Sequence, residues 1–305
     1  MVKPLLLLYF ILFTSLVKAQ ISSEYSSVQT ISYFAIGDKQ YYKVEKNAYK
    51  IKGEDTLTKS KISYDVDITV LDSGANFYII EWKYTNLKAN TNNKILDEVA
   101  TLSEDMRAVI KTSELGEVIS LENWKEIKKK SKKFIKKSKK KFPKNTFSKE
   151  VLSSLERNYR DEKGIFNNAI KDVHLYFNFH GGKYTMGESY DAIIKMPNIY
   201  NDSIDMALSV YLDNINDLEN NYVIRMMQTA NAEQLKDAAY KYMLSLNKLK
   251  KDAQPIKKSD IPPITNEINT AARIHTTGWV MYIIELKEVF SEEITKIDET
   301  IIELR

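Results

Sequence analysis

Apolar and polar residues alternate through the first third of the chain, and this pattern predicts antiparallel β-strands. Between Ile62 and Val70 every second residue is apolar and each residue between them is polar. Such alternation is typical of a strand with one buried and one solvated face. The segment 20–121 is therefore predicted to be a β-meander with a polar loop at 86–94. Its other strands are expected over residues 31–36, 40–51, 78–84, 106–112 and 118–121, separated by turns at Gly37-Asp38, Asp72-Ser73-Gly74 and Glu114-Leu115-Gly116.

Between residues 122 and 181 the apolar spacing changes to three and four, which predicts a helical segment. A lysine-rich helix comes first and is expected to end before Pro143, because proline disfavours helical geometry in the preceding residue. Ser148 is expected to cap a second helix, and residues 165–177 form the broad apolar face of a third. The end of that third helix, 173–179, also alternates like a strand.

β-strand patterns return in the C-terminal region, residues 182–305. Residues 204–212 alternate cleanly and are expected to pair with 222–229, and three more strands are predicted near 268–276, 280–289 and 294–304. One helix interrupts the strands. It is expected to be capped by Asn231 and to bury Leu235, Ala239, Tyr242, Leu246 and Leu249.

Strands, then helices, then strands, without βαβ alternation, predict an α+β fold. We expect a curved, half-barrel-like antiparallel β-sheet packed on the central helices, in a single domain over residues 20–305. Two separate β domains bridged by the helices are the alternative.

The lysine-rich helix dominates the charge distribution. Residues 125–144 carry twelve lysines and one glutamate in a chain whose formal net charge is +4, so the remainder is net negative. A thin apolar stripe runs through the same helix, and in one interpretation this stripe packs on the protein body while the lysines are merely solvated. The stripe consists of Trp124, Ile127, Phe134, Ile135 and Phe142.

In a second interpretation, the helix from Lys125 to Lys141 binds an anionic membrane or an anionic envelope polymer. Nucleic acid is a third option, but the run contains no arginine for base contacts and only two interleaved aromatic residues. The candidate surface-binding residues are Lys128, Lys129, Lys132, Lys133, Lys136, Lys137 and Lys140.

Residues 1–19 have the pattern of a secretory signal peptide and predict export. Lys3 provides the positive start, residues 4–17 the apolar core, and Val17-Lys18-Ala19 a small-residue cleavage site before Gln20. No cysteine follows the core, so we expect a soluble periplasmic or extracellular protein and not a lipoprotein. The whole chain lacks cysteine, which excludes thiol nucleophiles, thiolate zinc sites and iron–sulfur clusters.

Candidate catalytic groups are few. The three histidines, His174, His180 and His275, lack the spacing of a metal site. Residues 187–191, Gly-Glu-Ser-Tyr-Asp, resemble a nucleophile elbow whose second glycine is missing. Asp65 and Asp67 share the solvated face of a strand, and the acidic and amide residues of 213–220 lack the ligand order of an EF-hand, so a polar hairpin loop is favoured there. No cofactor is expected, because phosphate-loop and dinucleotide fingerprints are absent.

Three short segments carry a resemblance: Val17-Lys18-Ala19-Gln20, Leu115-Gly116-Glu117-Val118-Ile119 and Thr276-Thr277-Gly278-Trp279. With them the chain resembles β-rich bacterial proteins that are secreted or periplasmic, a class that implies no catalytic residues here. The expected curved sheet on helices is also similar in outline to lipoprotein-carrier folds, which hold acyl chains in their concavity.

Three functions follow as hypotheses. The first is an exported, non-enzymatic protein that encloses a lipid or other hydrophobic ligand between sheet and helices, with a pocket lined by Phe166, Ile170, Val173 and Phe177. The second is association with an anionic surface through the lysine-rich helix. The third is an enzyme, which requires His180, Glu188 or the Asp65/Asp67 pair to converge in one cleft.

Overall fold

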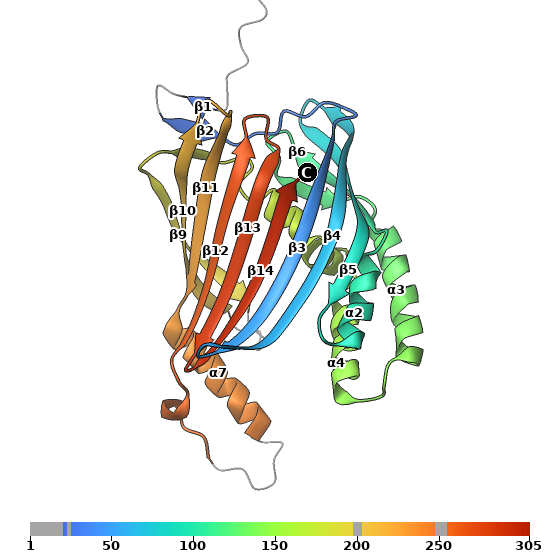
Figure 1. The fold of residues 1–305 in the computed structure, drawn as a ribbon, viewed down its shortest axis with the longest axis vertical. Helices are drawn as coiled ribbons and strands as arrows, with labels where there is room; N and C mark the ends of the chain where they lie inside the picture. The colour runs from blue at the N-terminus through green and yellow to red at the C-terminus, as the bar shows by residue number, and fades with distance from the viewer. Residues whose placement is uncertain (1–20, 23–25, 198–202, 248–254) are drawn as a thin grey trace, which may run out of the picture.

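The computed structural model describes residues 21–22, 26–197, 203–247 and 255–305. The signal peptide predicted at 1–19 lies outside these residues. An open antiparallel sheet of eleven strands, in the order β7-β6-β5-β4-β3-β14-β13-β12-β11-β10-β9, dominates the fold (Figure 1). Its strands are β3 (Lys39–Lys52), β4 (Asp55–Gly74), β5 (Phe77–Asn90), β6 (Arg107–Ser113), β7 (Val118–Leu121), β9 (Ser189–Pro197), β10 (Ser203–Asn216), β11 (Asn221–Ala230), β12 (Ile264–His275), β13 (Val280–Ser291) and β14 (Ile294–Leu304).

The α+β class and the antiparallel sheet are thereby confirmed. Strand β14 pairs with β3, with Ile302 opposite Val44, and so joins the C-terminal strands to the N-terminal ones in one continuous ladder. A separate small sheet contains β1 (Ile21–Ser22), β2 (Ser27–Gln29) and β8 (Lys183–Thr185).

The helices gather in three places. In Figure 1, α2, α3 and α4 stack beside β5, α7 projects from the opposite end of the sheet, and α5 and α6 lie behind the central strands. The helices are α2 (Lys94–Ala100), α3 (Trp124–Lys141), α4 (Thr146–Asn158), α5 (Glu162–Ala169), α6 (Lys171–Tyr176) and α7 (Ala232–Asn247), with short 3-10 turns at Thr101–Ser103 and Lys258–Asp260.

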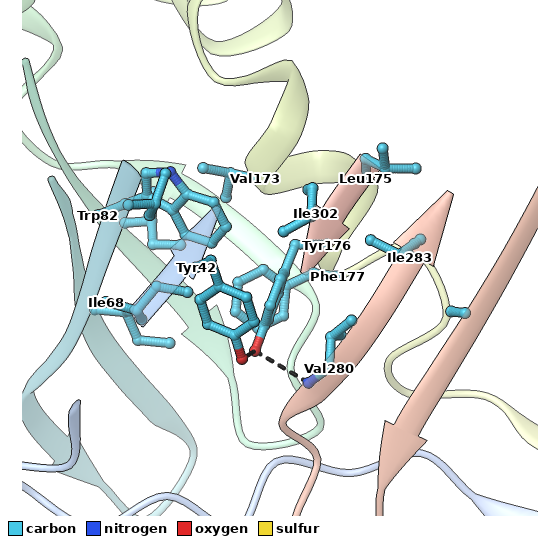
Figure 2. Packing of buried hydrophobic residues seen from close by; sticks show 14 of the residues in the cluster. Tyr42, Ile68, Trp82, Val173, Leu175, Tyr176, Phe177, Val280, Ile283 and Ile302 are labelled. Carbon is cyan, nitrogen blue, oxygen red and sulfur yellow. Dashed lines mark hydrogen bonds between the residues drawn. The ribbon is translucent and has the colours of Figure 1, made fainter. Parts of the chain in front are cut away.

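Tyr176 of α6 is the centre of the core. Its ring makes edge-on contacts with Tyr42 of β3 and Trp82 of β5, at centroid distances of 5.4 and 5.3 Å. Its hydroxyl lies 2.9 Å from the hydroxyl of Tyr42 and accepts a hydrogen bond from the backbone N–H of Val280 (Figure 2). Such aromatic pairs add to the hydrophobic stabilisation of area burial, and here they fix α6 against three strands.

The alternating strands are confirmed where the pattern was cleanest. Residues 64, 66, 68 and 70 of β4 are buried, and β10 pairs with β11 as expected. Pro143 directly follows the extended residue Phe142 that ends α3, and Asn231 caps α7 through its side chain.

Several local predictions were wrong. The polar loop expected at 86–94 is strand β5 as far as Asn90, and α2 begins at Lys94. Residues 31–36 form no strand, because they run past the β12–β13 turn, where Tyr33 N–H donates to the Thr277 carbonyl. Asn145, not Ser148, caps the second helix, since its side chain accepts the Ser148 N–H and α4 begins earlier. The residues 72–74 lie inside β4, so the turn before β5 comes after them. The expected third helix is divided into α5 and α6 at Ile170, where His174 Nε2 lies 2.8 Å from the Phe166 carbonyl.

A further difference concerns α7. Leu235 packs against the strands, but Tyr242 and Leu246, which were expected to be buried, are 44% and 39% exposed. The helix extends beyond the edge of the sheet, so only its first half has a surface to cover (Figure 1). Leu249 lies outside the described residues.

Candidate functional site

Helix α3 separates its lysines from a buried stripe. Ile127, Ser131, Ile135 and Ser138 recur every three or four residues and are buried. Ile135 belongs to a small apolar cluster with Leu102 and with Leu152 and Leu155 of α4. The predicted stripe was therefore correct for Ile127, Ile135 and Phe142, whereas Trp124 and Phe134 are only partly buried. The buried side of α3 also includes two serines, Ser131 and Ser138, which the sequence did not single out.

The opposite face of α3 carries the seven lysines singled out from the sequence. Lys128 is partly buried and Lys129, Lys132, Lys133, Lys136, Lys137 and Lys140 are exposed. Two other lysines of α3 have acidic partners, since Lys139 pairs with Glu156 and Lys141 with Glu98. Within the described residues, none of the seven makes such an ion pair. Their charge is therefore available to a ligand, and we call this set the lysine face.

A groove of about 500 Å³ runs between α3 and α4 beside the lysine face. Lys128, Lys132 and Lys136 line one side, and Arg160 lies on the other. Ile135, Tyr159 and one acidic residue, Glu156, also line it, so the groove combines an excess of cationic side chains with apolar contact area. This combination suits an anionic head group with adjoining hydrocarbon.

A buried polar network lies under this region and was not found from the sequence. Asp172 of α6 is 3% exposed and accepts hydrogen bonds from the hydroxyls of Tyr64 and Tyr84, at 3.0 and 2.9 Å. Burial and the Asp172 charge raise the pKa of both tyrosines, and they raise the pKa of Tyr159 to about 12. The signal was present as inward tyrosines on neighbouring strands facing an aspartate within an apolar helix. Each group is satisfied by the others, so the network holds α6 on the sheet.

The histidines have structural partners. His180 is buried, its Nε2 lies 2.8 Å from the Gly278 carbonyl, and burial lowers its pKa to about 4. His275 Nδ1 lies 2.8 Å from Thr277 Oγ1 within the β12–β13 turn. No group of three or more His, Asp or Glu in the described ranges has the arrangement of a metal site.

The groups required by the enzyme hypothesis lie apart. Asp65 is on the outer face of β4, where it pairs with Arg305 and accepts a hydrogen bond from Asn86. His180 packs on Tyr176 and Phe177 on the inner side of the sheet. Glu188 is exposed in the turn between β8 and β9. The sheet therefore separates the carboxylate from the imidazole.

The remaining motifs have local explanations. Ser189 lies on β9 and its hydroxyl donates to Asp191, so the strand–turn–helix context of a nucleophile elbow is missing. In the segment 213–220, Asp213 pairs with Arg225 at 2.7 Å and the Asn216 side chain accepts the Glu219 N–H. These contacts stabilise a polar hairpin.

The four side chains expected to line a ligand pocket come together in the core. Ile170 and Val173 are fully buried, Phe177 is 5% exposed, and Phe166 packs on the same cluster. Phe177 also borders a surface pocket of about 470 Å³ that contains His174, Asn178 and His180.

No protein-family model matches the chain, and no curated protein is significantly similar to it. Two solved structures are distantly similar. One is lipovitellin, in a study of lipid–protein interactions, with 7% identity and a TM-score of 0.41, covering 89% of this chain and 25% of that one. The other is an outer membrane channel from Pseudomonas putida F1, with 5% identity and a TM-score of 0.18, covering 93% and 99%. The chain thus spans a quarter of the lipovitellin chain, and neither likeness defines a family.

Proposed function

We propose that this is an exported, non-enzymatic protein that binds anionic membrane surfaces through the lysine face of α3. The observation that carries the proposal is the set of seven lysines without acidic partners on one side of a helix whose other side is packed. Each lysine near an anionic lipid surface contributes about 1 kcal/mol at physiological ionic strength. Several lysines on one helix face therefore suffice for reversible binding.

Peripheral attachment is the mode this proposal requires. None of the helices in the described ranges combines the length and hydrophobicity needed to cross a membrane. The apolar side of α3 packs on α4, so the helix contributes charge and the adjoining groove contributes contact area. Export is supported by the pattern of residues 1–19 and by the resemblance to secreted or periplasmic β-rich bacterial proteins.

Co-sedimentation with vesicles tests the proposal. The protein is mixed with phosphatidylcholine vesicles, with and without phosphatidylglycerol, over a series of salt concentrations. We expect binding only to the anionic vesicles and a steep loss with salt, because exposed charges are screened within about 10 Å at 0.1 M. Binding to both kinds of vesicle, or binding indifferent to salt, would overturn the proposal.

A matched pair of variants locates the site. One variant changes four lysines of the lysine face to glutamine, and the control changes four exposed lysines of the sheet strands, so both lose the same net charge. Only the first is expected to lose vesicle binding, and equal losses would indicate a nonspecific charge effect. The first set is Lys129, Lys133, Lys136 and Lys140, and the control set is Lys39, Lys59, Lys83 and Lys88.

A further inference from the structure

The inner face of the sheet can be followed row by row across six strands. Val44 of β3 lies opposite Ile302, which lies opposite Ile283, and the row continues through Ala272 and Ile224 to Leu212 of β10. All six residues are at most 3% exposed. This row lies in the main core together with residues of α6, including Val173 and Tyr176.

The next two rows have a different composition and different exposure. The first of them contains Lys46, Thr300, Glu285, Thr270, Met226 and Val210, and the second contains Ala48, Asp298, Lys287, Ile268, Gln228 and Leu208. Most of these side chains are accessible to solvent, although they lie on the same face as the core. We call these two rows the inner belt.

One half of the inner belt is charged, and its lysines lie among two carboxylates, Glu285 and Asp298. Lys46 and Lys287 project from it, and Lys171 at the start of α6 is close enough for both to act on its charge. Burial, reinforced by Lys287 and Lys46, lowers the pKa of Lys171. Lys287 pairs with Glu285 at 2.9 Å, and Lys46 lies over the ring of Tyr64. In the described residues, Lys46 and Lys171 form no ion pair, so the three lysines outnumber Glu285 and Asp298 by one and the cluster keeps a small positive charge.

The other half of the inner belt is apolar. Val210 and Leu208 of β10 are half-buried at the margin of the core, as is Ile268 beside α7, and Met226 is 8% exposed. Thr270 lies between the two halves, and its buried hydroxyl has no hydrogen-bond partner. An unpaired buried hydroxyl costs about 1–3 kcal/mol, so this position lowers the stability of the fold.

We propose that the inner belt binds an anionic amphiphile with a single acyl chain, whose head group contacts Lys46, Lys171 and Lys287 and whose chain lies over Met226, Val210 and Leu208. The order of the sheet sets the scale of this site. Strands β13 and β10 are three spacings apart, about 14 Å, which an extended medium-chain acyl group spans. The proposed ligand lies on the two rows next to the core row that α6 covers. It therefore does not require Ile170 or Val173 to move.

The test uses decanoate as the probe, with acetate and 1-decanol as analogues that lack the chain or the charge. Isothermal titration calorimetry of the whole protein is expected to show saturable decanoate binding and at least tenfold weaker binding of both analogues. No decanoate binding, or equal binding of 1-decanol, would overturn the proposal.

Variants on opposite faces of the same strands provide the controls. Lys46→Met combined with Lys171→Met is expected to weaken decanoate binding at least tenfold, whereas Lys43→Met, on the outer face of β3, leaves it unchanged. Leu208→Asn is expected to weaken binding in the same way and Ala207→Asn, on the outer face of β10, is not. Thermal melting of each variant verifies folding. Lys287→Met, at an exposed position of the same cluster, is also expected to weaken decanoate binding. Equal effects on both faces would refute the assignment.

The two proposed sites fail independently. The four-lysine variant of α3 is expected to bind decanoate normally, and the Lys46/Lys171 variant is expected to bind anionic vesicles normally. Loss of decanoate binding in the α3 variant alone would overturn the inner belt and leave the vesicle result to decide the lysine face.

Discussion

The hydroxyl of Tyr84 on β5 donates a hydrogen bond to Oδ1 of Asp172 on α6, across 2.9 Å. The other carboxylate oxygen accepts the Tyr64 hydroxyl, so one side chain of a short helix satisfies two strands at once. Because α6 contributes only six residues, its own backbone stabilises it little, and it depends on such tertiary contacts.

Replacing this acceptor is expected to destabilise the protein strongly. Asp172→Ala leaves two buried hydroxyls without a partner, and the expected loss is about 2–5 kcal/mol in the free energy of unfolding. Urea denaturation measures it. The control, Asp217→Ala in the exposed β10–β11 hairpin, is expected to stay within about 0.5 kcal/mol. Equal effects of the two changes would show that the network contributes nothing.

His180 predicts a dependence of stability on pH. Its pKa is lowered to about 4 in the folded protein from an ordinary value near 6.5, because burial disfavours the cation. The unfolded chain therefore binds more protons between these values, and stability falls as the pH falls from about 6.5 to 4. The total loss is about 3 kcal/mol from this group. His180→Gln, which cannot titrate, is expected to flatten the curve of unfolding free energy against pH in this window; an unchanged slope would contradict the assignment.

Gly278 has a conformation and a position that exclude a side chain. Its φ is +87°, and an added Cβ would collide with the backbone of Ile31 and Ser32. Gly278→Ala is therefore expected to lower the melting temperature well beyond the effect of Gly53→Ala. Gly53 also has a positive φ, but open space surrounds it, so about 1 kcal/mol of backbone strain is the whole expected cost there. Similar melting temperatures for the two variants would show that the segment 31–36 can move aside.

Alanine substitutions in the two halves of α7 are expected to have different effects on stability. Leu235 packs on the cluster around Met206, so Leu235→Ala is expected to cost about 1–2 kcal/mol. Leu246→Ala removes a side chain that is largely in solvent and is expected to change stability by less than about 0.5 kcal/mol. Denaturation midpoints of both variants provide the comparison, and a larger effect at Leu246 would support the amphipathic pattern of the sequence over the structure.

Thr270 tests the cost of an unpaired buried hydroxyl. Thr270→Val removes the unpaired buried hydroxyl while keeping the shape of the side chain, so the ligand-free protein is expected to gain about 1 kcal/mol. Thr265→Val, exposed on the same strand, is the control. A loss of stability at Thr270 would indicate that its hydroxyl already has a partner.

Sequence patterns predicted those elements whose two faces differ clearly. The strand over 62–70 and the pairing of 204–212 with 222–229 follow from alternation, and α3 ends where Pro143 requires it. The ends of helices and the exposure of individual side chains were harder to predict. Asn145 and Ser148 are both good caps, and only the tertiary position of α4 selects Asn145. Tyr242 and Leu246 have helical periodicity, but periodicity does not show that the sheet ends before them.

The candidate sites were predictable to different degrees. The lysine face is a local pattern within one helix, so each of its residues could be predicted from the sequence alone. The inner belt could not, because Lys46 and Lys287 stand in strands with polar residues on both sides, and only the register across β3, β14 and β13 shows that they face inward. Asp172 was missed for the same reason, since its tyrosine partners are about 90 to 110 residues away in the chain.

The pairing of β14 with β3 also affects how the chain reaches its native state. The two strands are separated by most of the sequence, and this ladder cannot form until both are present. Long-range pairing of this kind is slow, because a very large loop must close before any contact rewards it. Until then β3 and β14 each have a free edge that another molecule can pair with. Refolding yield should therefore fall as protein concentration rises, and a chaperone that shields strand edges should restore it.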